Sequence, residues 1–214
     1  MGSQSTGKLE AVIMIQSKED YKFYLKADRI ALDMHRERPR LIGDDVWKFE
    51  RLLRKAEYFG NCKKDAVSRL YLNYIHYKLY KLGLKLGFFI PPNVFGPGLS
   101  IAFWSGPILV NLKAKVGANC RISQCVTIGR TGGDSEEVPP KIGNNVFIGP
   151  GAVIVGSIEI ADGIAIGANS FVNKSFKEPG ITIAGSPARK VSDKAPKLSI
   201  RATEIIEKYA RQKQ

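Results

Sequence analysis

The residues able to exchange protons near neutral pH are few and lie in separate parts of the sequence. The 214-residue chain has two histidines, His35 and His76, both in its first half. His76 stands in an apolar and aromatic stretch, where we expect a packing role. Histidine is the usual general base at neutral pH. Any base in the second half of the chain must therefore come from another residue type.

Carboxylates in one short segment are the next source of proton acceptors. Residues 130–141 combine glycines and prolines, which are typical of a loop, with Asp134, Glu136 and Glu137. A carboxylate has an ordinary pKa near ~4, so it becomes a useful base only where burial raises that pKa. These side chains could also orient an ammonium group and collect its proton.

The cysteines do not form a pattern that binds metal. The chain has three cysteines, Cys62, Cys120 and Cys125, and no two of them form a Cys-x-x-Cys pair. An odd number without such a pair argues against a disulfide framework and a zinc site. We expect no metal ion and a reducing, cytoplasmic compartment. We expect Cys120 to be a small packing residue rather than a nucleophile.

Composition excludes several function classes. Hydrophobic residues make up 44% of the chain and the formal net charge is +13, as in a globular protein with a basic surface. The longest apolar run, Leu82–Ile90, is interrupted by Lys85 and is too short to span a membrane. No nucleic-acid-binding motif is present, so we expect no nucleic acid partner. A polyanionic small molecule would use the same electrostatics.

The second half of the chain has an apolar period of six residues. Isoleucine or valine recurs at Val110, Val116, Ile122, Ile128, Ile142, Ile148, Ile154, Ile160, Ile166 and Val172. Neither a helix nor a flat strand has this period, but a solenoid with three short faces per turn does. We expect these side chains to fill a three-sided prism. The six-residue period is broken between Ile128 and Ile142, which divides these residues into two series that are out of phase. We therefore expect a loop to leave the coil at residues 130–141.

The chain on either side of this repeat predicts helices. Apolar residues recur at three-to-four spacing from Lys18 to Lys85, with a helix start at Asp44 and Asp45 and an end at Gly60. A short amphipathic helix is expected near the C-terminus. The expected organisation is a flexible N-terminus (1–17), a helical segment (18–92), a solenoid domain (93–192) with its protruding loop, and a C-terminal helix (193–214).

Three phrases, together with the repeat and the loop, carry a resemblance to a known family. They are residues 90–98, residues 123–129 and the closing segment Ala-Gly-Ser-Pro-Ala-Arg at 184–189. The chain resembles the left-handed β-helix (hexapeptide-repeat) acyltransferases, in particular the serine acetyltransferase-like branch. The resemblance implies a mainly β fold, a left-handed parallel β-helix with an N-terminal α-helical segment and a short C-terminal helix. It also implies a homotrimer.

The resemblance further implies acetyl-CoA as co-substrate, lying along a groove between coils. Backbone amides would hold its pantetheine arm, and cations would hold its phosphates. The residues that match the family's cofactor motif are Gly149, Ala168, Lys174, Ala184, Gly185, Arg189 and Lys190.

The sequence departs from the family at the catalytic positions. The first family histidine falls on Trp104, and the aspartate before it falls on Phe103. The second family histidine falls on Pro139. The remaining candidates for the catalytic site are Trp104, Asp134, Glu136 and Glu137.

Three interpretations of this departure stay open. An amine acceptor, such as an amino sugar of a surface-polysaccharide pathway, has a usable neutral fraction and needs no strong base. Trp104 and Phe103 would then form a stacking wall. A hydroxyl acceptor would need a loop carboxylate as base. The positions that would bind the carboxylate and amine of serine in the family are apolar here, so we favour a sugar, with serine O-acetylation as an alternative. Alternatively, the chain is a catalytically inactive binding or scaffold homologue.

Overall fold

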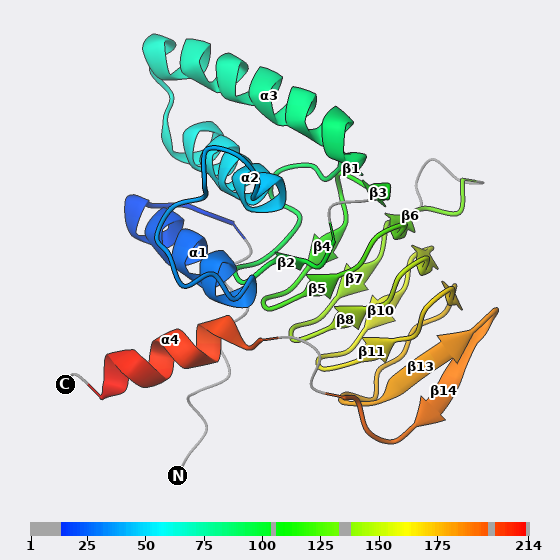
Figure 1. Ribbon diagram of the computed structural model, residues 1–214. Coiled ribbons are helices and arrows are strands. Elements are labelled where there is room, and N and C mark those ends of the chain that lie inside the picture. The colour runs from blue at the N-terminus through cyan, green and yellow to red at the C-terminus, as the bar shows by residue number, and fades with distance from the viewer. Residues whose placement is uncertain (1–13, 104–105, 133–137, 197–199, 213–214) are drawn as a thin grey trace.

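The protein combines a helical segment with a coil of short parallel strands (Figure 1). The computed structural model describes residues 14–103, 106–132, 138–196 and 200–212. The helices in these ranges are α1 (Lys18–Ala31), α2 (Asp45–Cys62), α3 (Ala66–Leu86) and α4 (Ala202–Arg211). They contain more residues than the strands, so the described chain is mixed α and β rather than mainly β.

The strands form three sheets that the chain visits in turn. One sheet contains β1 (Phe88–Phe89), β3 (Ile108–Val110), β6 (Thr127–Gly129), β9 (Val153–Val155) and β12 (Phe171–Val172). A second contains β4 (Lys115–Val116), β7 (Lys141–Ile142) and β10 (Glu159–Ile160). The third contains β2 (Ser100–Ile101), β5 (Arg121–Ile122), β8 (Phe147–Ile148), β11 (Ala165–Ile166), β13 (Thr182–Gly185) and β14 (Ala188–Ser192). All pairings are parallel except the β13–β14 hairpin.

The prediction of stacked isoleucine and valine rungs is confirmed. All ten predicted positions are buried, with relative exposures of 4% or less. The register places Ile122, Ile148 and Ile166 directly above one another on the third sheet. Each sheet has its own column of this kind, and the three columns fill the inside of the coil. The core of the coil is therefore built from β-branched residues, isoleucine or valine, that recur every six positions.

The segment predicted to protrude, residues 130–141, lies between β6 and β7, and its residues 133–137 lie outside the described residues. Its described end is fixed to the next coil, since Ser157 accepts a hydrogen bond from Val138 N at 3.1 Å and donates one to Val138 O at 2.9 Å. The break in the six-residue period thus falls between β6 and β7, and the protrusion of this segment stays a prediction.

The helix boundaries differ from the sequence prediction at two glycines. Gly60 does not end α2, which continues to Cys62, and Gly83 lies inside α3. A Cβ on Gly83 would stand 2.7 Å from Phe88 O, so the glycine permits close packing of α3 on the start of the coil. Gly87, with φ +76°, ends α3 instead because a residue without Cβ adopts this left-handed conformation easily.

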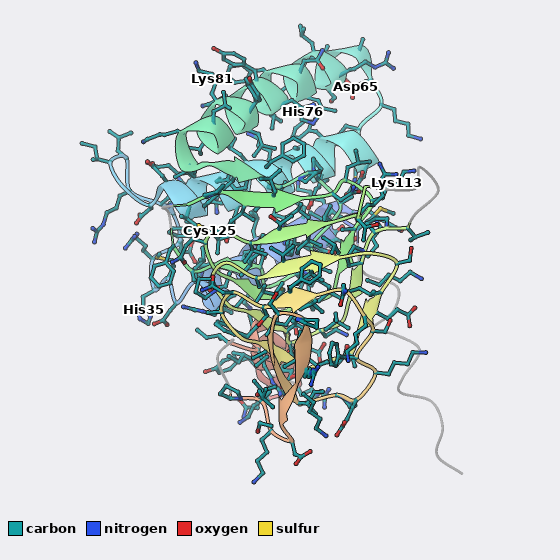
Figure 2. The ribbon with its side chains drawn as sticks, turned by 90° about the vertical axis from the view of Figure 1, so that its right-hand side faces the viewer. His35, Asp65, His76, Lys81, Lys113 and Cys125 are labelled. Atoms are coloured by element: carbon teal, nitrogen blue, oxygen red, sulfur yellow. The ribbon has the colours of Figure 1, made fainter. Side chains whose placement is uncertain are left out.

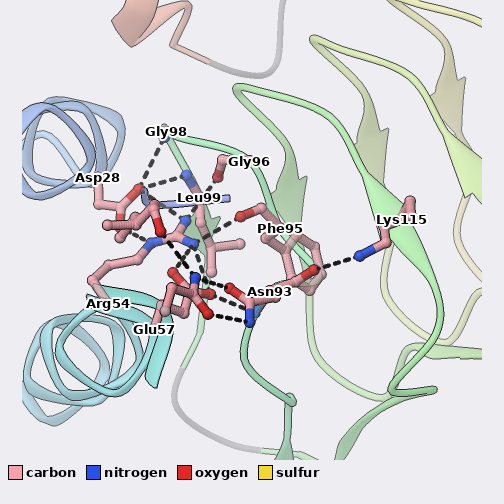
Figure 3. A network of polar contacts seen from close by, with 11 residues as sticks. Asp28, Arg54, Glu57, Asn93, Phe95, Gly96, Gly98, Leu99 and Lys115 are labelled. Carbon is pink, nitrogen blue, oxygen red and sulfur yellow. Dashed lines mark hydrogen bonds and ion pairs between the residues drawn. The ribbon is translucent and has the colours of Figure 1, made fainter. Parts of the chain in front are cut away.

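A buried polar network joins the helices to the first turn of the coil (Figure 3). Arg54 on α2 forms ion pairs with Asp28 at 2.7 Å and with Glu57 at 3.0 Å, and all three side chains are almost fully buried. Its guanidinium also donates to the carbonyls of Phe95 and Gly96, each at 2.7 Å. Burial lowers the pKa of Arg54, but the two carboxylates outweigh it and raise that pKa.

The same network holds the backbone that leads into β2. Asp28 accepts hydrogen bonds from Gly98 N at 2.9 Å and Leu99 N at 3.0 Å. Glu50 on α2 accepts one from Ile101 N at 3.1 Å. Residues 98–101 are therefore placed by carboxylates of α1 and α2, and Phe103 lies two positions after Ile101.

The C-terminal helix packs against the first helix. Ala202 lies in a small buried cluster with Ala27 and Ala31 of α1. Thr203 also exchanges two hydrogen bonds with Asn119, at 2.8 and 3.1 Å. Helices α1 and α4 thus lie side by side next to the coil (Figure 1).

Candidate functional site

A cavity of about 580 Å³ lies where the helical segment meets the start of the coil. Its wall is mostly apolar, and its polar groups are Asp44, Asp45 and Lys85 at the ends of α2 and α3. The lining residues are Leu32, Met34, Gly43, Asp44, Asp45, Val46, Trp47, Lys85, Leu86, Ile101, Ala102 and Phe103. We call this cavity the acceptor pocket because it contains Phe103, one of the positions at which the sequence departs from the family.

The pocket has charges of both signs at its rim. Asp45 is bound by Lys85 at 2.5 Å and by Lys48 at 3.4 Å. The hydrogen bond from Lys85 is the main reason that the pKa of Asp45 lies below its usual range. An ammonium group beside a carboxylate is an arrangement that can bind a small zwitterion or an amino-bearing molecule.

Asp44 has a different function from the one predicted. Its side chain does not cap α2, and the residue has φ +53°. Instead it accepts hydrogen bonds from Arg40 N at 2.7 Å and from Arg36, and the backbone bond is the largest cause of the lowered pKa of Asp44. Asp44 thus holds the segment between α1 and α2 along one side of the pocket. Because their pKa values are low, neither Asp44 nor Asp45 is suited to act as a general base.

Trp47 also lines the pocket, although the residue is only 1% exposed. Its indole nitrogen, Trp47 Nε1, is shielded from solvent and has no hydrogen-bond partner among the described residues. The contribution of Trp47 to the pocket is therefore apolar ring surface.

The predicted catalytic residues are only partly placed. Trp104, Asp134, Glu136 and Glu137 lie outside the described residues. Phe103 is described: it lines the pocket and is 53% exposed.

Neither histidine lines the pocket that contains Phe103. His76 is exposed on α3, so the expectation of a packing role was wrong, although its neighbours Ile75 and Leu79 on the same helix are buried. The side chain of His35 is 93% exposed, in the segment between α1 and α2. The two lie far apart (Figure 2). Pro139, at the second family histidine position, is buried.

The cysteines differ in exposure. Cys120 is 1% exposed, and burial raises the pKa of its thiol to about 12, which keeps it protonated. It is a packing residue, as predicted. Cys125 is exposed on the coil. Within the described ranges, no three side chains of the types His, Cys, Asp and Glu gather to hold a metal ion.

Two of the predicted cofactor residues, Gly149 and Ala184, stand in one column on the coil, with Gly167 between them in the register of the third sheet. Ala168 lies one position further along the chain, and a Cβ on Gly149 would stand 2.8 Å from Ala168 N. Ala168 is exposed and Ala184 is half-buried, whereas Gly149 is buried and donates its backbone N–H to Ile166 O at 2.9 Å. Small side chains at these positions let successive coils stack closely.

The column ends at the β13–β14 hairpin. Gly185 pairs with Ala188, and Ala184 pairs with Arg189. Arg189 is exposed, and no ion pair involving it occurs among the described residues. Lys190 is instead held by Glu178 and Asp193, each at 2.6 Å, and the hydrogen bond that Lys190 donates to Asp193 is the main reason that the pKa of Lys190 is raised. Arg189 is therefore the better placed cation for a phosphate.

Lys174 is not brought to this column. It follows β12 on the first sheet, at a different corner of the coil, and its ammonium group lies 5.5 Å from the centre of the Phe176 ring. The motif that pointed to Lys174 is present, but the fold of a single chain separates it from Gly149 and Arg189.

Sequence reasoning missed the acceptor pocket. The signal was present in the adjacent acidic pair Asp44 and Asp45, which were interpreted only as a helix start. Lys85 was treated only as a break in an apolar run. The pocket depends on contacts between residues about forty positions apart, such as Asp45 with Lys85.

Comparisons with known proteins agree with this architecture. Residues 139–174 match the family described as bacterial transferase hexapeptide (six repeats). Mitochondrial serine acetyltransferase 3 of Arabidopsis thaliana is 39% identical over 111 residues, which cover 48% of this chain and 28% of the relative. Serine acetyltransferase of Haemophilus influenzae is 41% identical over 108 residues, covering 50% of this chain and 40% of the relative. The matched stretch thus spans well under half of these relatives.

Solved structures extend the similarity to the helices. Serine acetyltransferase of Brucella abortus strain S19 in complex with coenzyme A superposes with a TM-score of 0.61 at 25% identity, covering 83% of this chain and 70% of that one. Soybean serine acetyltransferase complexed with serine gives a TM-score of 0.59 at 26% identity, covering 81% of this chain and 68% of that one.

Proposed function

We propose that this chain, which contains the hexapeptide repeat of the bacterial transferases, is an acetyl-CoA-dependent acetyltransferase. The observation that supports the proposal is the column of small residues Gly149, Gly167 and Ala184, which ends beside Arg189. A related protein of known structure binds coenzyme A. We take the coil to be left-handed, as the resemblance implies.

The column and Arg189 suit the two parts of the cofactor. The pantetheine arm would lie along this column of small residues, beside the exposed Ala168, and the Arg189 guanidinium would pair with phosphate oxygens. When bound, the cofactor supplies an activated acetyl group. The chain's own residues then have to bind the acceptor and accept its proton.

Serine is the first candidate acceptor. The relatives named above are serine acetyltransferases, and one structural relative is complexed with serine. Our sequence interpretation placed serine below a sugar because the matching positions looked apolar. The rim of the acceptor pocket has Lys85 to meet a carboxylate and Asp45 to meet an ammonium group, and this favours an amino acid.

An amino sugar is the second candidate. Phe103, rather than a proton acceptor, lines the pocket. A neutral amine attacks a thioester without a strong base, whereas a hydroxyl group does not. The comparisons give no support to a polysaccharide pathway, so this candidate rests on the pocket wall alone.

We also propose a homotrimer. The outer face of the first sheet has a continuous row of side chains in register, running from Phe89 through Leu109, Thr127 and Val153 to Phe171. Phe89 is 61% exposed and Leu109 51% exposed in the single chain. Apolar rows of this kind mark contacts between proteins.

Release of coenzyme A is the test. Acetyl-CoA is supplied with serine, an amino sugar or a hydroxyl sugar, and the free thiol is measured. We expect turnover with serine, a weaker response to the amino sugar, and saturable binding of acetyl-CoA that falls about tenfold in Arg189→Ala. The matched control Lys113→Ala removes an exposed cation elsewhere on the coil and should leave binding unchanged.

Other outcomes of the coenzyme A release assay would change or contradict the proposed function. Turnover of the amino sugar alone would replace serine by an amine acceptor. Saturable binding without turnover of any acceptor would identify an inactive homologue. No binding of acetyl-CoA, with Arg189→Ala indistinguishable from the parent, would contradict the transferase proposal.

A further inference from the structure

A groove with a cationic lining runs along the outer side of α2, between α1 and α3. Its volume is about 680 Å³, and it is separate from the column on the coil. Basic side chains dominate its lining: Lys48, Arg51, Lys55, Lys78, Lys81 and Lys85. None of the described residues that line it is a carboxylate. Tyr21 and Tyr77 supply aromatic surface at the same place.

The basic side chains of the groove fall into two groups. Lys48 and Lys85 hold Asp45, and Lys55 donates to the hydroxyl of Tyr71. Arg51 and Lys81 have no ion pair among the described residues, although they face the same space. Like charges gathered without counterions repel one another, so an anion in the groove would relieve that repulsion.

We propose that this groove binds a soluble small molecule bearing a phosphate or diphosphate group, with Arg51 and Lys81 as its principal contacts. A guanidinium presents paired N–H donors that match two phosphate oxygens, and a lysine adds a point charge. Tyr21 and Tyr77 would contact an apolar or aromatic part of the same molecule.

The shape of the groove favours a compact ligand. Its volume lies within the ~300–1,000 Å³ of small-molecule sites, and its cations face one concave space. A lipid bilayer or a nucleic acid duplex would need the cations to be spread over an open surface. The same phosphate chemistry could come from a lipid headgroup, so the experiment compares the two sources.

The groove is connected to the acceptor pocket. Lys85 lines both spaces, and Asp45 at the rim of the pocket is bound by Lys48 and Lys85. A phosphate in the groove would compete with Asp45 for these two ammonium groups. Binding of a phosphate in the groove would therefore change the charge at the rim of the acceptor pocket. We thus expect occupancy of the groove to change the affinity of the pocket for an acceptor.

Binding of inorganic pyrophosphate, measured by calorimetry at fixed ionic strength, tests the proposal. The double variant Arg51→Gln/Lys81→Gln should bind at least tenfold more weakly than the parent protein. Lys113→Gln/Lys177→Gln, which removes the same charge from exposed positions on the coil, should change the affinity less than twofold. Arg189→Ala should also leave pyrophosphate affinity unchanged, which separates the groove from the proposed cofactor site.

Other outcomes of these binding measurements would contradict the groove proposal or the transferase proposal. Absence of pyrophosphate binding, or equal losses in both double variants, would overturn the proposal. Sedimentation with phosphatidylglycerol vesicles in the absence of pyrophosphate binding would identify a lipid surface and overturn the soluble ligand. Acetyl-CoA binding is measured on the same proteins. Its absence alongside intact pyrophosphate binding would remove the transferase proposal and leave the groove site standing.

Discussion

At the scale of single residues, Arg54 is the group on which the junction between helices and coil depends. It is fully buried and holds two carboxylates and two backbone carbonyls. Such a network is costly to break because the remaining charges stay buried without partners. The turn leading to Phe103 is therefore fixed by ionic contacts as well as by apolar packing.

Replacement of Arg54 by methionine should lower the free energy of unfolding by about 3–5 kcal/mol. The reason is that Asp28 and Glu57 lose their counterion inside the protein. Urea denaturation measures the change. Arg69→Met, on the exposed side of α3, should stay within about 0.5 kcal/mol of the parent. A loss below 1 kcal/mol for Arg54→Met would mean that the network contributes little.

Glu50 provides a second residue-scale prediction. It is fully buried, and burial together with the nearby Asp28 raises the pKa of Glu50 well above its usual range. Below its ordinary pKa of about 4.3 the carboxyl is protonated in both the folded and the unfolded chain. As pH rises, the unfolded chain loses its proton first, so stability falls until the folded pKa is reached.

Glu50→Gln should therefore stabilise the protein at pH 8 relative to the parent but not at pH 4. The amide oxygen of glutamine can still accept the bond from Ile101 N. A tenfold difference in proton affinity between folded and unfolded chains corresponds to about 1.4 kcal/mol. Thermal unfolding across pH measures the effect, with the exposed Glu37→Gln as control. A difference between variant and parent that does not change with pH would contradict the prediction.

At the scale of elements, the coil depends on close contact between successive turns. A Cβ on Gly117 would stand 2.8 Å from Gly143 O, whereas a Cβ on Gly129 would meet nothing within 4 Å. Both glycines follow a strand of the repeat, so the sequence alone treats them alike. The difference arises because the coil stacks directly on Gly117, while the segment of residues 130–141 begins next to Gly129.

Gly117→Ala should therefore destabilise the protein by about 1–3 kcal/mol because backbone must move apart. Gly129→Ala should be neutral or stabilise it by up to about 1 kcal/mol, since it restricts only the unfolded chain. Chemical denaturation of the two variants side by side makes the comparison. Equal destabilisation by both would show that the stacking distance is not the deciding factor.

At the scale of the whole molecule, the exposed row on the first sheet is the feature that a single chain does not explain. Leu109 lies in that row between Phe89 and Thr127. If three copies bury it, a charge at this position has to be removed from water upon assembly, which is unfavourable. The oligomeric state is thus tied to one face of the coil.

We expect sedimentation velocity to give the mass of a trimer for the parent chain and a smaller mass for Leu109→Glu. Leu41→Glu, at a position 95% exposed in the segment between α1 and α2, should keep the parent mass. A monomeric parent protein would overturn the trimer. An unchanged mass for Leu109→Glu would place the interface on another face.

The sequence by itself determined the coil and much of the cofactor column. One branched residue at every sixth position leaves few other arrangements, because only a three-faced solenoid buries all of them at once. Gly149, Ala168, Ala184 and Arg189 were instead proposed from their match to the family's cofactor motif. Lys174 was proposed in the same way, although it follows a strand of the first sheet while Gly149 follows a strand of the third.

Only the tertiary structure decided the acceptor pocket, the cationic groove and the Arg54 network. Each brings together residues that are distant in sequence, such as Asp28 with Leu99 or Asp45 with Lys85. Local patterns record which face of a helix is apolar but not which partner that face meets. Helix packing supplies the partner, and it thereby sets the charges around each cavity.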